Sequence, residues 1–205
     1  MKLDPFYLIV DDAAWLERLA PQGVRLVQLR VKDRDETEVR AQIRLAKRVC
    51  DAARAQLIVN DYWRLAIEEA CDFVHLGQSD LDGADVAALR AAGVKIGLST
   101  HDEAELARAL ALEPDYVALG PVYPTLLKQM RFAPQGLDRV GEWKNRIGAV
   151  PLVAIGGLTP ERARLALQAG ADSACVVTDI LRNKDPEGRT REWIEATAPW
   201  RSHFT

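Results

Sequence analysis

The 205-residue sequence has few cysteines, no strong excess of either charge and no long apolar run. Its three cysteines lack Cys-x-x-Cys spacing, which argues against a zinc site or a disulfide framework and suits a reducing cytoplasm. A net charge of −3 gives no reason to expect a nucleic acid or an anionic membrane as partner. The apolar run at residues 6–10 ends at two aspartates and is too short for a signal peptide or a membrane span. Any bound anion must therefore be held by a local cluster of Lys, Arg and backbone N–H groups.

Apolar runs of strand length recur along the chain and are nearly continuous, as in strands that are buried on both faces of a parallel sheet. We predict strands at residues 6–10, 26–29, 57–59, 73–76, 94–98, 116–119, 152–155 and 174–177. Amphipathic segments lie between them, and we predict helices at residues 13–20, 36–53, 63–70, 84–91, 102–111, 137–146, 160–169 and 187–196. Asp35 and the pair Thr159-Pro160 are typical helix starts.

This alternation predicts an α/β protein with a parallel sheet and helices outside it. Eight strand–helix units favour closure into a (β/α)₈ TIM barrel, although the pattern alone also permits an open, doubly wound sheet. No composition break or Ser/Gly-rich linker marks a boundary, so we expect one barrel domain over residues 1–205.

Chemistry in such a barrel sits at the C-terminal ends of the strands. The polar or small residues that follow the predicted strands are Gln28, Arg30, Lys32, Asn60, Asp61, Asp80, Ser99, Thr125, Lys128, Gly156, Gly157 and Thr178. Thr125 and Lys128 belong to residues 120–136, a long connection with no helical period, which we interpret as an active-site loop over an anionic ligand.

Two carboxylates and three cations among these residues suggest a specific chemistry. Mg²⁺ is usually held by one or two carboxylates together with substrate phosphates, which fits Asp61 and Asp80. Together with Arg30, Lys32 and Lys128, the metal would neutralise a diphosphate and make it a good leaving group. Gly156-Gly157, followed by a helix start, offers a separate phosphate site.

Each residue also has a simpler interpretation. Asp61 could cap a helix, and Asp80 could form a turn with Leu81-Asp82-Gly83. We interpret His101 as the start of a helix rather than a general base, because the sequence shows no carboxylate partner for it. The joint occurrence of these residues at predicted strand ends is what favours a functional site.

At these residues the sequence resembles the thiamine phosphate synthase family. The matching segments, in family order, are VQLRVKD (27–33), NDYWRLA (60–66), VHLGQSD (74–80), GLSTHD (97–102), KQM (128–130), APQGL (133–137) and VAIGG (153–157). The resemblance implies a (β/α)₈ barrel that joins 4-amino-2-methyl-5-hydroxymethylpyrimidine diphosphate to a thiazole phosphate, releases diphosphate and uses Mg²⁺. It also implies small-molecule substrates, with no nucleic acid or membrane as partner.

The resemblance assigns roles position by position. It implies that the pyrimidine diphosphate is bound by Gln28, Arg30, Lys32, Asn60, Ser99 and Lys128. It implies Asp61 and Asp80 as metal ligands. The implied thiazole-phosphate pocket consists of Thr125, Gly156, Val176, Val177 and Thr178. Arg30, Lys32, Ser99 and Lys128 are the implied catalytic residues. The implied route is dissociative and needs no side-chain nucleophile, in keeping with the lack of a Ser/His/Asp or Cys/His arrangement here.

The chain departs from the family at Leu127, where the pattern Thr-x-Thr-Lys has its second Thr. Loss of one neutral donor is expected to cost about 0.5–1.5 kcal/mol, roughly 2- to 12-fold in affinity for the thiazole phosphate. Arg131 is a candidate replacement contact. Position 178 has Thr where the family typically has Ser, which keeps a hydroxyl.

Two other functions are compatible with a barrel of this kind. A related thiazole tautomerase shares the barrel but dispenses with the diphosphate and metal residues, which are present here, and Pro121 stands where that family would be expected to have a His. A non-catalytic ligand-binding barrel is suggested only by Leu126-Leu127. The sequence does not decide whether the chain forms a homo-oligomer, or whether the tail at 193–205 covers the barrel bottom or joins a subunit interface.

Overall fold

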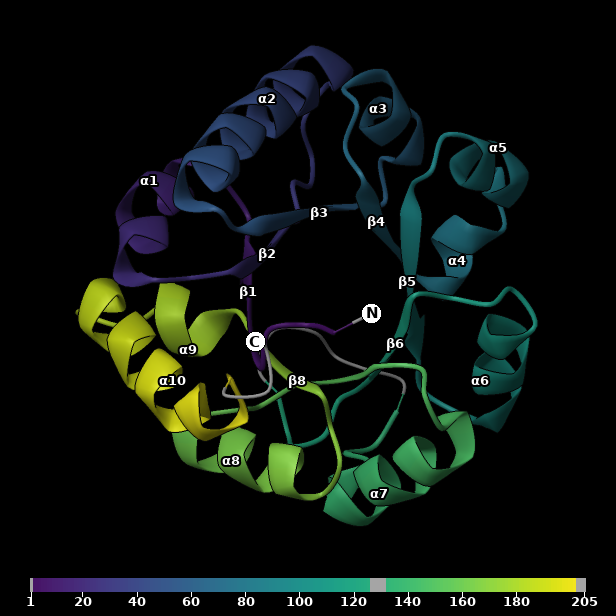
Figure 1. Cartoon of the computed structure of the whole chain (residues 1–205), viewed down its shortest axis with the longest axis vertical. Coiled ribbons are helices and arrows are strands. Elements are labelled where there is room, and N and C mark those ends of the chain that lie inside the picture. Colours follow the sequence, from purple (N-terminus) through teal and green to yellow (C-terminus); the bar gives the residue numbers. More distant parts are fainter. Residues whose placement is uncertain (1, 126–131, 202–205) are drawn as a thin grey trace.

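The computed structural model describes residues 2–125 and 132–201. Its eight strands are all parallel and close into a barrel in the order β1 to β8, with β1 paired to β8. The helices form a ring outside the strands (Figure 1). The structure therefore confirms the (β/α)₈ barrel and excludes the open sheet. That residues 1–205 constitute one domain stays a prediction.

The strands begin and end close to the predicted apolar runs. They are β1 (Phe6–Val10), β2 (Leu26–Leu29), β3 (Gln56–Asn60), β4 (Phe73–Leu76), β5 (Lys95–Thr100), β6 (Tyr116–Leu119), β7 (Leu152–Ile155) and β8 (Ser173–Val176). The helices are α1 (Ala14–Leu19), the 3-10 helix η1 (Ala20–Gln22), α2 (Glu36–Ala53), α3 (Trp63–Glu68), α4 (Gln78–Leu81), α5 (Val86–Ala91), α6 (Glu103–Leu110), α7 (Gly136–Ile147), α8 (Pro160–Gln168), α9 (Thr178–Leu181) and α10 (Pro186–Arg201).

Three details differ from the sequence prediction. The short helices η1, α4 and α9 were not predicted, because three or four residues cannot display a helical period. Strand β5 continues through Ser99 and Thr100, which were placed after it. Strand β8 ends at Val176, and Val177 instead precedes α9. The end of an apolar run therefore does not predict the last residue of a strand.

Alternate strand residues separate the core into two layers, as the period of two requires. Residues such as Leu8, Val27 and Val74 belong to the outer layer, which packs against the helices. Tyr7, Ile58, Phe73, Tyr116 and Val153 belong to a second cluster, which fills the barrel interior. The barrel interior is thus a packed core of side chains.

Gly97 leaves the room that one interior ring needs. A Cβ at Gly97 would lie 2.1 Å from Cζ of Tyr116 and 2.2 Å from its Cε1. The fully buried Tyr116 ring stacks on His75 with 5.5 Å between centroids and lies 5.6 Å from the ring of Phe73. Glycine at this position of β5 therefore lets an aromatic residue occupy the middle of the barrel.

Polar side chains cap the starts of α2 and α8. Asp35 accepts a hydrogen bond from the backbone N–H of Glu38 at 2.9 Å, and Thr159 accepts one from Arg162 at 3.4 Å, as the sequence predicted. At the other end of the chain, α10 buries Trp193 completely, and its ring stacks on Phe6 at 5.7 Å. This part of the C-terminal segment packs on the barrel of its own chain, while residues 202–205 lie outside the described residues.

The three cysteines, Cys50, Cys71 and Cys175, are buried and unbonded to one another. Burial raises the pKa of Cys50 to about 12 and that of Cys71 to about 11, so neither thiol is a nucleophile at neutral pH. No helix in residues 2–125 and 132–201 is long and apolar enough to cross a membrane.

Candidate active site

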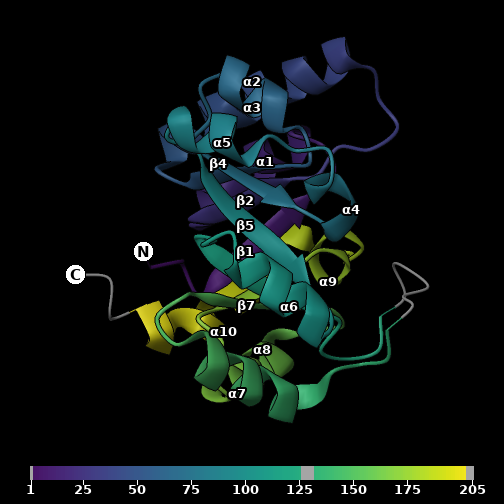
Figure 2. The same cartoon turned by 90° about the vertical axis from the view of Figure 1, so that its right-hand side faces the viewer.

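The side view separates the two ends of the barrel. The described N-terminal residues begin at one end, and the short helices α4 and α9 lie at the other, with the C-terminal ends of the strands (Figure 2). The candidate site residues predicted from the sequence follow the strands at this second end. We call it the catalytic end.

A cation from one strand end meets a carboxylate from the next. Lys32, which follows β2, forms an ion pair with Asp61, which follows β3. Asp61 has a positive φ of 63°, and its backbone N–H donates to the carbonyl of His75 on β4 at 2.9 Å. That conformation turns the chain directly at the strand end. The Asp61 carboxylate caps no helix: α3 has no side-chain cap, so the helix-cap interpretation is wrong.

A second carboxylate lies beside the first. Asp80 stands in the one-turn helix α4, and its backbone carbonyl accepts a hydrogen bond from the Gly83 N–H at 3.2 Å. The backbone therefore forms the turn of the simpler interpretation, while the side chain lies beside Asp61. Burial raises the pKa of the Asp80 carboxyl, the negative charge of Asp61 raises it further, and Lys32 opposes both effects. A hydrogen bond between the two carboxyl groups also contributes to the raised pKa. Two carboxylates this close repel each other when both are charged.

That pair of oxygen donors fits a divalent cation. Mg²⁺ is bound by carboxylate oxygens, often with several positions left to water and substrate phosphates. A bound cation would relieve the repulsion between Asp61 and Asp80. Within the described part of the chain, no group of three or more His, Cys, Asp or Glu side chains could hold a metal. A dedicated all-protein cage is therefore not formed by these residues, and a carboxylate pair that shares its metal with a substrate suits this arrangement.

Ser99 and Gln28 are held by an interior network. His75 Nε2 lies 2.8 Å from Oγ of Ser99, and Gln78 Nε2 donates to the backbone carbonyl of Ser99 at 2.7 Å. Gln28 Nε2 donates to the hydroxyl of Tyr7 at 2.8 Å. Burial lowers the pKa of His75 to about 4, so this ring is neutral at pH 7. Both predicted residues are thus positioned by barrel side chains rather than by solvent.

Asn60 and Arg30 have polar groups available to a ligand. Asn60 is only 5% exposed, yet among the described residues no side chain or backbone group hydrogen-bonds to its amide. Arg30 is exposed, and its charge is near enough to His75 to help lower the pKa of that ring. The predicted convergence of Gln28, Arg30 and Lys32 on one end of the barrel is therefore in keeping with the structure.

The second predicted anion site lies between β6 and β7. Gly156 and Gly157 have φ of 103° and 63°, and a Cβ on Gly156 would lie 2.6 Å from Cβ of Pro121. Tyr123 N–H donates to the Gly156 carbonyl at 3.0 Å. The two loops thus approach each other too closely for any other residue at these positions.

The remaining residues of the predicted thiazole-phosphate pocket lie near this end of β8 or in the loop after β6. Val176 is buried at the end of β8, and Val177 and Thr178 are half-buried at the start of α9. Thr125 is half-buried. Arg162, in the first turn of α8, donates to the Gly157 carbonyl at 2.7 Å, and its guanidinium lies 4.6 Å from the centroid of the Tyr123 ring.

His101 has a carboxylate partner that the sequence analysis did not identify. Its Nδ1 lies 2.7 Å from Oε2 of Glu105, one turn later, and Phe132 stacks on the imidazole at 4.7 Å. The backbone carbonyl of His101 accepts a hydrogen bond from Gln135 at 2.9 Å. The residue therefore ties the far end of the 120–136 loop to β5. Leu126, Leu127, Lys128 and Arg131 lie outside the described residues, so their predicted roles stay predictions.

Comparison with known proteins identifies the family. A family model described as thiamine monophosphate synthase matches residues 6–180. The chain is 67% identical to the thiamine-phosphate synthase of Rhizobium etli over 202 residues, covering 98% of this chain and 99% of that protein. It is 46% identical to the thiamine-phosphate synthase of Citrobacter koseri over 192 residues, covering 94% and 88%. The chain belongs to the thiamine phosphate synthase family. It is therefore an enzyme of the transferase class.

A solved thiamine phosphate pyrophosphorylase from Pyrococcus furiosus has the same fold. It superposes with a TM-score of 0.84 at 23% identity, covering 96% of each chain. The barrel that the resemblance to thiamine phosphate synthases implied is thus confirmed by the structure and by this neighbour.

Three interior residues of this thiamine phosphate synthase family member were missed as contributors to the site. Tyr7, His75 and Tyr116 join Gln28 and Ser99 in one hydrogen-bonded network. The sequence contained a sign of their role. Each has a hydrogen-bonding group in its side chain and lies in an apolar run that was predicted to be a buried strand. A polar group in such a strand needs a partner, and here the partners are one another.

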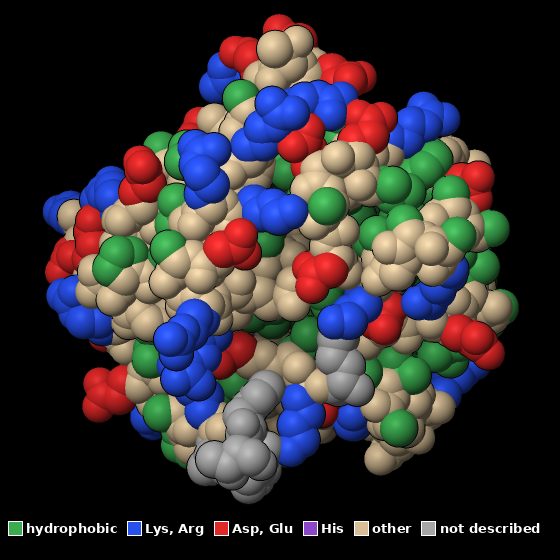
Figure 3. Space-filling model, turned by 45° about the horizontal axis from the view of Figure 1, so that its top comes forward, with side chains coloured by type: hydrophobic (Ala, Val, Ile, Leu, Met, Phe, Trp, Pro, Cys, Tyr) green, Lys and Arg blue, Asp and Glu red, His purple; other side chains and the backbone are tan. Residues whose placement is uncertain are grey.

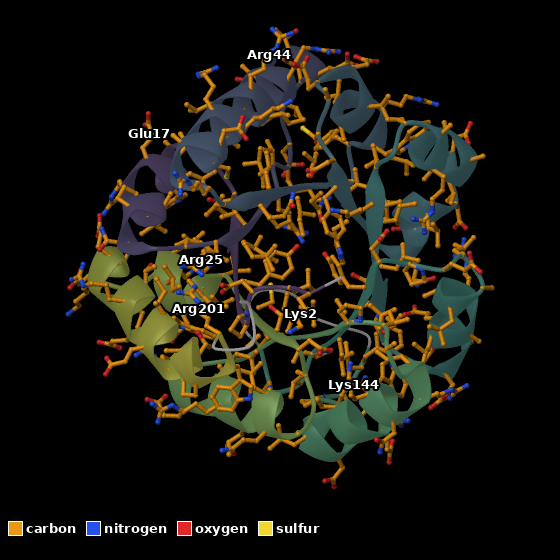
Figure 4. The ribbon with its side chains drawn as sticks, in the orientation of Figure 1. Lys2, Glu17, Arg25, Arg44, Lys144 and Arg201 are labelled. Atoms are coloured by element: carbon orange, nitrogen blue, oxygen red, sulfur yellow. The ribbon has the colours of Figure 1, made fainter. Side chains whose placement is uncertain are left out.

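The opposite end of the barrel has a separate hollow of about 710 Å³. Its lining includes Lys2, Arg25, Asp72 and Lys95 and none of the predicted site residues. Lys2 lies near the barrel axis in Figure 4, with Arg25 nearer the side. On the face shown in Figure 3, Lys and Arg side chains are interspersed with Asp and Glu, with no large patch of one sign.

Proposed function

We propose that this chain joins 4-amino-2-methyl-5-hydroxymethylpyrimidine diphosphate to a thiazole phosphate, giving thiamine phosphate and diphosphate. The observation that carries the proposal is the meeting of Lys32, Asp61 and Asp80 at the ends of neighbouring strands in a member of this family. A cation beside a carboxylate pair suits a substrate that carries several negative charges and is bound with a metal. The other candidate residues that the structure describes lie at or after strand ends at the same catalytic end.

Asp61 and Asp80 would hold Mg²⁺, because they are the adjacent carboxylates of the site. When bound there, Mg²⁺ would supply positive charge to the departing diphosphate. Lys32 keeps the pair from carrying two uncompensated charges. Arg30 and Lys128 would add further cations, and Ser99 a hydroxyl donor. Charge stabilisation of this kind acts on the leaving group and needs no general base.

The reaction balances without a protein nucleophile. The bond between the pyrimidine methylene carbon and the diphosphate oxygen breaks, and its electron pair leaves with diphosphate. The lone pair of the thiazole nitrogen then forms the new C–N bond to the methylene carbon. No proton moves in these two steps. Positioning of the two substrates is the second task of the protein, and preorganised positioning supplies a large part of many enzymatic accelerations.

Thiazole phosphate would bind where the β6 and β7 loops meet. Gly156 offers backbone close to a ligand, and Thr125, Val176, Val177 and Thr178 would complete the pocket. The start of α8 adds the partial positive charge of a helix N-terminus. A cytoplasmic location and a homo-oligomer stay predictions.

The test is a discontinuous assay with both substrates, in which thiamine phosphate is separated and quantified by mass spectrometry. We expect product that requires Mg²⁺, stops with EDTA and is lost in Asp61→Ala. Asp51→Ala removes an exposed carboxylate of α2 as a matched control and is expected to retain activity.

Three outcomes would contradict parts of the proposal. Isomerisation of the thiazole without joining would favour the tautomerase. Binding of either substrate without any turnover, at saturating concentrations, would favour the non-catalytic barrel. Turnover that EDTA does not change would remove the assignment of Asp61 and Asp80 to Mg²⁺.

A further inference from the structure

A continuous row of hydrogen bonds crosses the barrel interior and ends at Ser99. Gln28 Nε2 lies 2.8 Å from the Tyr7 hydroxyl, which lies 3.0 Å from the Tyr116 hydroxyl. Tyr116 Oη lies 2.7 Å from His75 Nδ1, and His75 Nε2 lies 2.8 Å from Ser99 Oγ. The row spans strands β1, β2, β4, β5 and β6. We call it the interior relay.

The direction of these bonds follows from counting protons. An amide nitrogen donates and cannot accept, so the Tyr7 oxygen accepts from Gln28. Tyr7 is only 1% exposed, so its own proton needs a partner, and the remaining one is the Tyr116 oxygen. Tyr116 is fully buried, and its proton then goes to His75 Nδ1. The imidazole thus carries its proton on Nε2 and donates to Ser99.

The other direction fails at the far end. If His75 carried its proton on Nδ1, Tyr116 would accept it and would donate to Tyr7. The Tyr7 proton would then face the amide nitrogen of Gln28, and two donors would meet. Buried donors without acceptors are costly. Within residues 2–125 and 132–201, every fully buried side-chain nitrogen and oxygen has a hydrogen-bond partner. The first direction is the one that also gives each buried proton of the relay an acceptor.

We infer that the interior relay makes Ser99 an obligatory hydrogen-bond donor toward the ligand. Because His75 donates to Ser99 Oγ, the serine proton is not used in the relay. Ser99 is half-buried and stands at the catalytic end, so that proton is available to an anionic oxygen. Tyr7, Tyr116 and His75 act through Ser99 and are positioning residues. The inference rests on the proposed function for the identity of the anion, the substrate diphosphate, but the tautomer itself does not depend on it.

Nitrogen NMR of the intact protein tests the tautomer without any substrate. The chain has three histidines, so the ring signals are few, and His75→Gln assigns the relevant pair. At neutral pH we expect the Nε2–H tautomer for His75 in the wild type. An Nδ1–H tautomer, or an equal mixture of the two forms, would overturn the relay. This outcome is independent of whether thiamine phosphate is formed.

Steady-state kinetics then test the action through Ser99. Tyr116→Phe removes the proton that His75 Nδ1 accepts, and Tyr7→Phe is a second variant in case the first folds poorly. Loss of one neutral hydrogen bond is worth roughly 2- to 12-fold, so we expect kcat/KM for the pyrimidine diphosphate to fall by about that factor. The KM for the thiazole phosphate is expected to stay unchanged, because the relay ends at the other substrate.

A double-mutant cycle separates positioning from general damage. In a Ser99→Ala background, Tyr116→Phe is expected to cause no further loss, because its effect passes through the missing hydroxyl. Additive losses would overturn the inference. Thr197→Val is the matched control: it removes a buried hydroxyl from α10, where Thr197 donates to the Trp193 carbonyl at 2.9 Å, and it is expected to leave the kinetics unchanged.

Discussion

The close approach of β5 to an interior ring makes Gly97→Ala a severe test of the packing. The added Cβ would lie 2.1 Å from Cζ, 2.2 Å from Cε1 and 2.6 Å from Oη of Tyr116. Carbon atoms in contact are about 3.5 Å apart, so the ring must move by roughly 1.4 Å. The Tyr116 ring is fully buried and packs against the rings of Tyr7, Phe73 and His75, so a shift of this size displaces other core side chains. The substitution is therefore an overpacking of a filled core.

The magnitude follows from measured overpacking costs. Extra methyl groups in well-packed cores cost about 1–3 kcal/mol. For a protein of this length, each kcal/mol lowers the melting temperature by roughly 2–4 °C, so we expect a fall of roughly 2–12 °C. The Tyr116 hydroxyl now lies 2.7 Å from His75 Nδ1. A displacement of roughly 1.4 Å would break this hydrogen bond, so activity is expected to fall at least as far as in Tyr116→Phe.

Thermal unfolding followed by circular dichroism, together with the product assay, measures both effects. Gly141→Ala in helix α7 is the control, because a Cβ there would lie at an ordinary contact distance of 3.4 Å from the Ala169 carbonyl oxygen. It is expected to be neutral or stabilising by up to about 1 kcal/mol. Replacing the ring with a smaller side chain in the double variant Gly97→Ala/Tyr116→Leu should restore part of the lost stability. A Gly97→Ala protein with the melting temperature and kinetics of the wild type would refute the reasoning.

Three further outcomes are expected. Hydrogen bonds from Arg44 and Arg40 lower the pKa of Glu69 to about 2, and Glu69→Gln removes the charge that they stabilise. Because the folded pKa is depressed, this charge stabilises the wild type above the unfolded pKa near 4.5, and the contribution disappears as the pH falls toward 2. The melting temperatures of the two proteins should therefore differ at pH 7 and converge in acid. Gly156→Ala would force an alanine into a φ of 103° and bring its Cβ against the loop after β6. The KM for the thiazole phosphate should rise and the stability should fall, and unchanged kinetics would contradict the proposed pocket. Leu127→Thr should lower the thiazole-phosphate KM by roughly 2- to 12-fold, and an unchanged KM would remove that interpretation.

Long, periodic segments were predicted well from the sequence. Helix α2 has the predicted bounds, because 18 residues display the apolar stripe repeatedly and Asp35 supplies a cap. The strands were found because each is a nearly unbroken apolar run. The one-turn helices α4 and α9 were not found. Four residues are too few to display a helical period.

Site residues were located more easily than their contacts. The sequence placed Lys32, Asp61 and Asp80 at the ends of neighbouring strands. It left open whether Asp61 capped a helix or bound a metal, and it did not show the ion pair with Lys32. His101 shows the same limit, since Glu105 is only four residues away and was not identified as its partner. Side-chain partners depend on rotamers and on the direction in which a loop leaves its strand, and the spacing of residues predicts neither.

The sequence by itself determined the alternation of strands and helices, the barrel class and the family, because these depend on local period and on ordered short motifs. Only the tertiary structure decided what the barrel interior does. Tyr7 and Tyr116 are 109 residues apart and meet because the sheet closes on itself. Closure of the sheet aligns strands that are distant in sequence at one level of the axis, and there Gly97 makes room for the ring that connects Gln28 to Ser99.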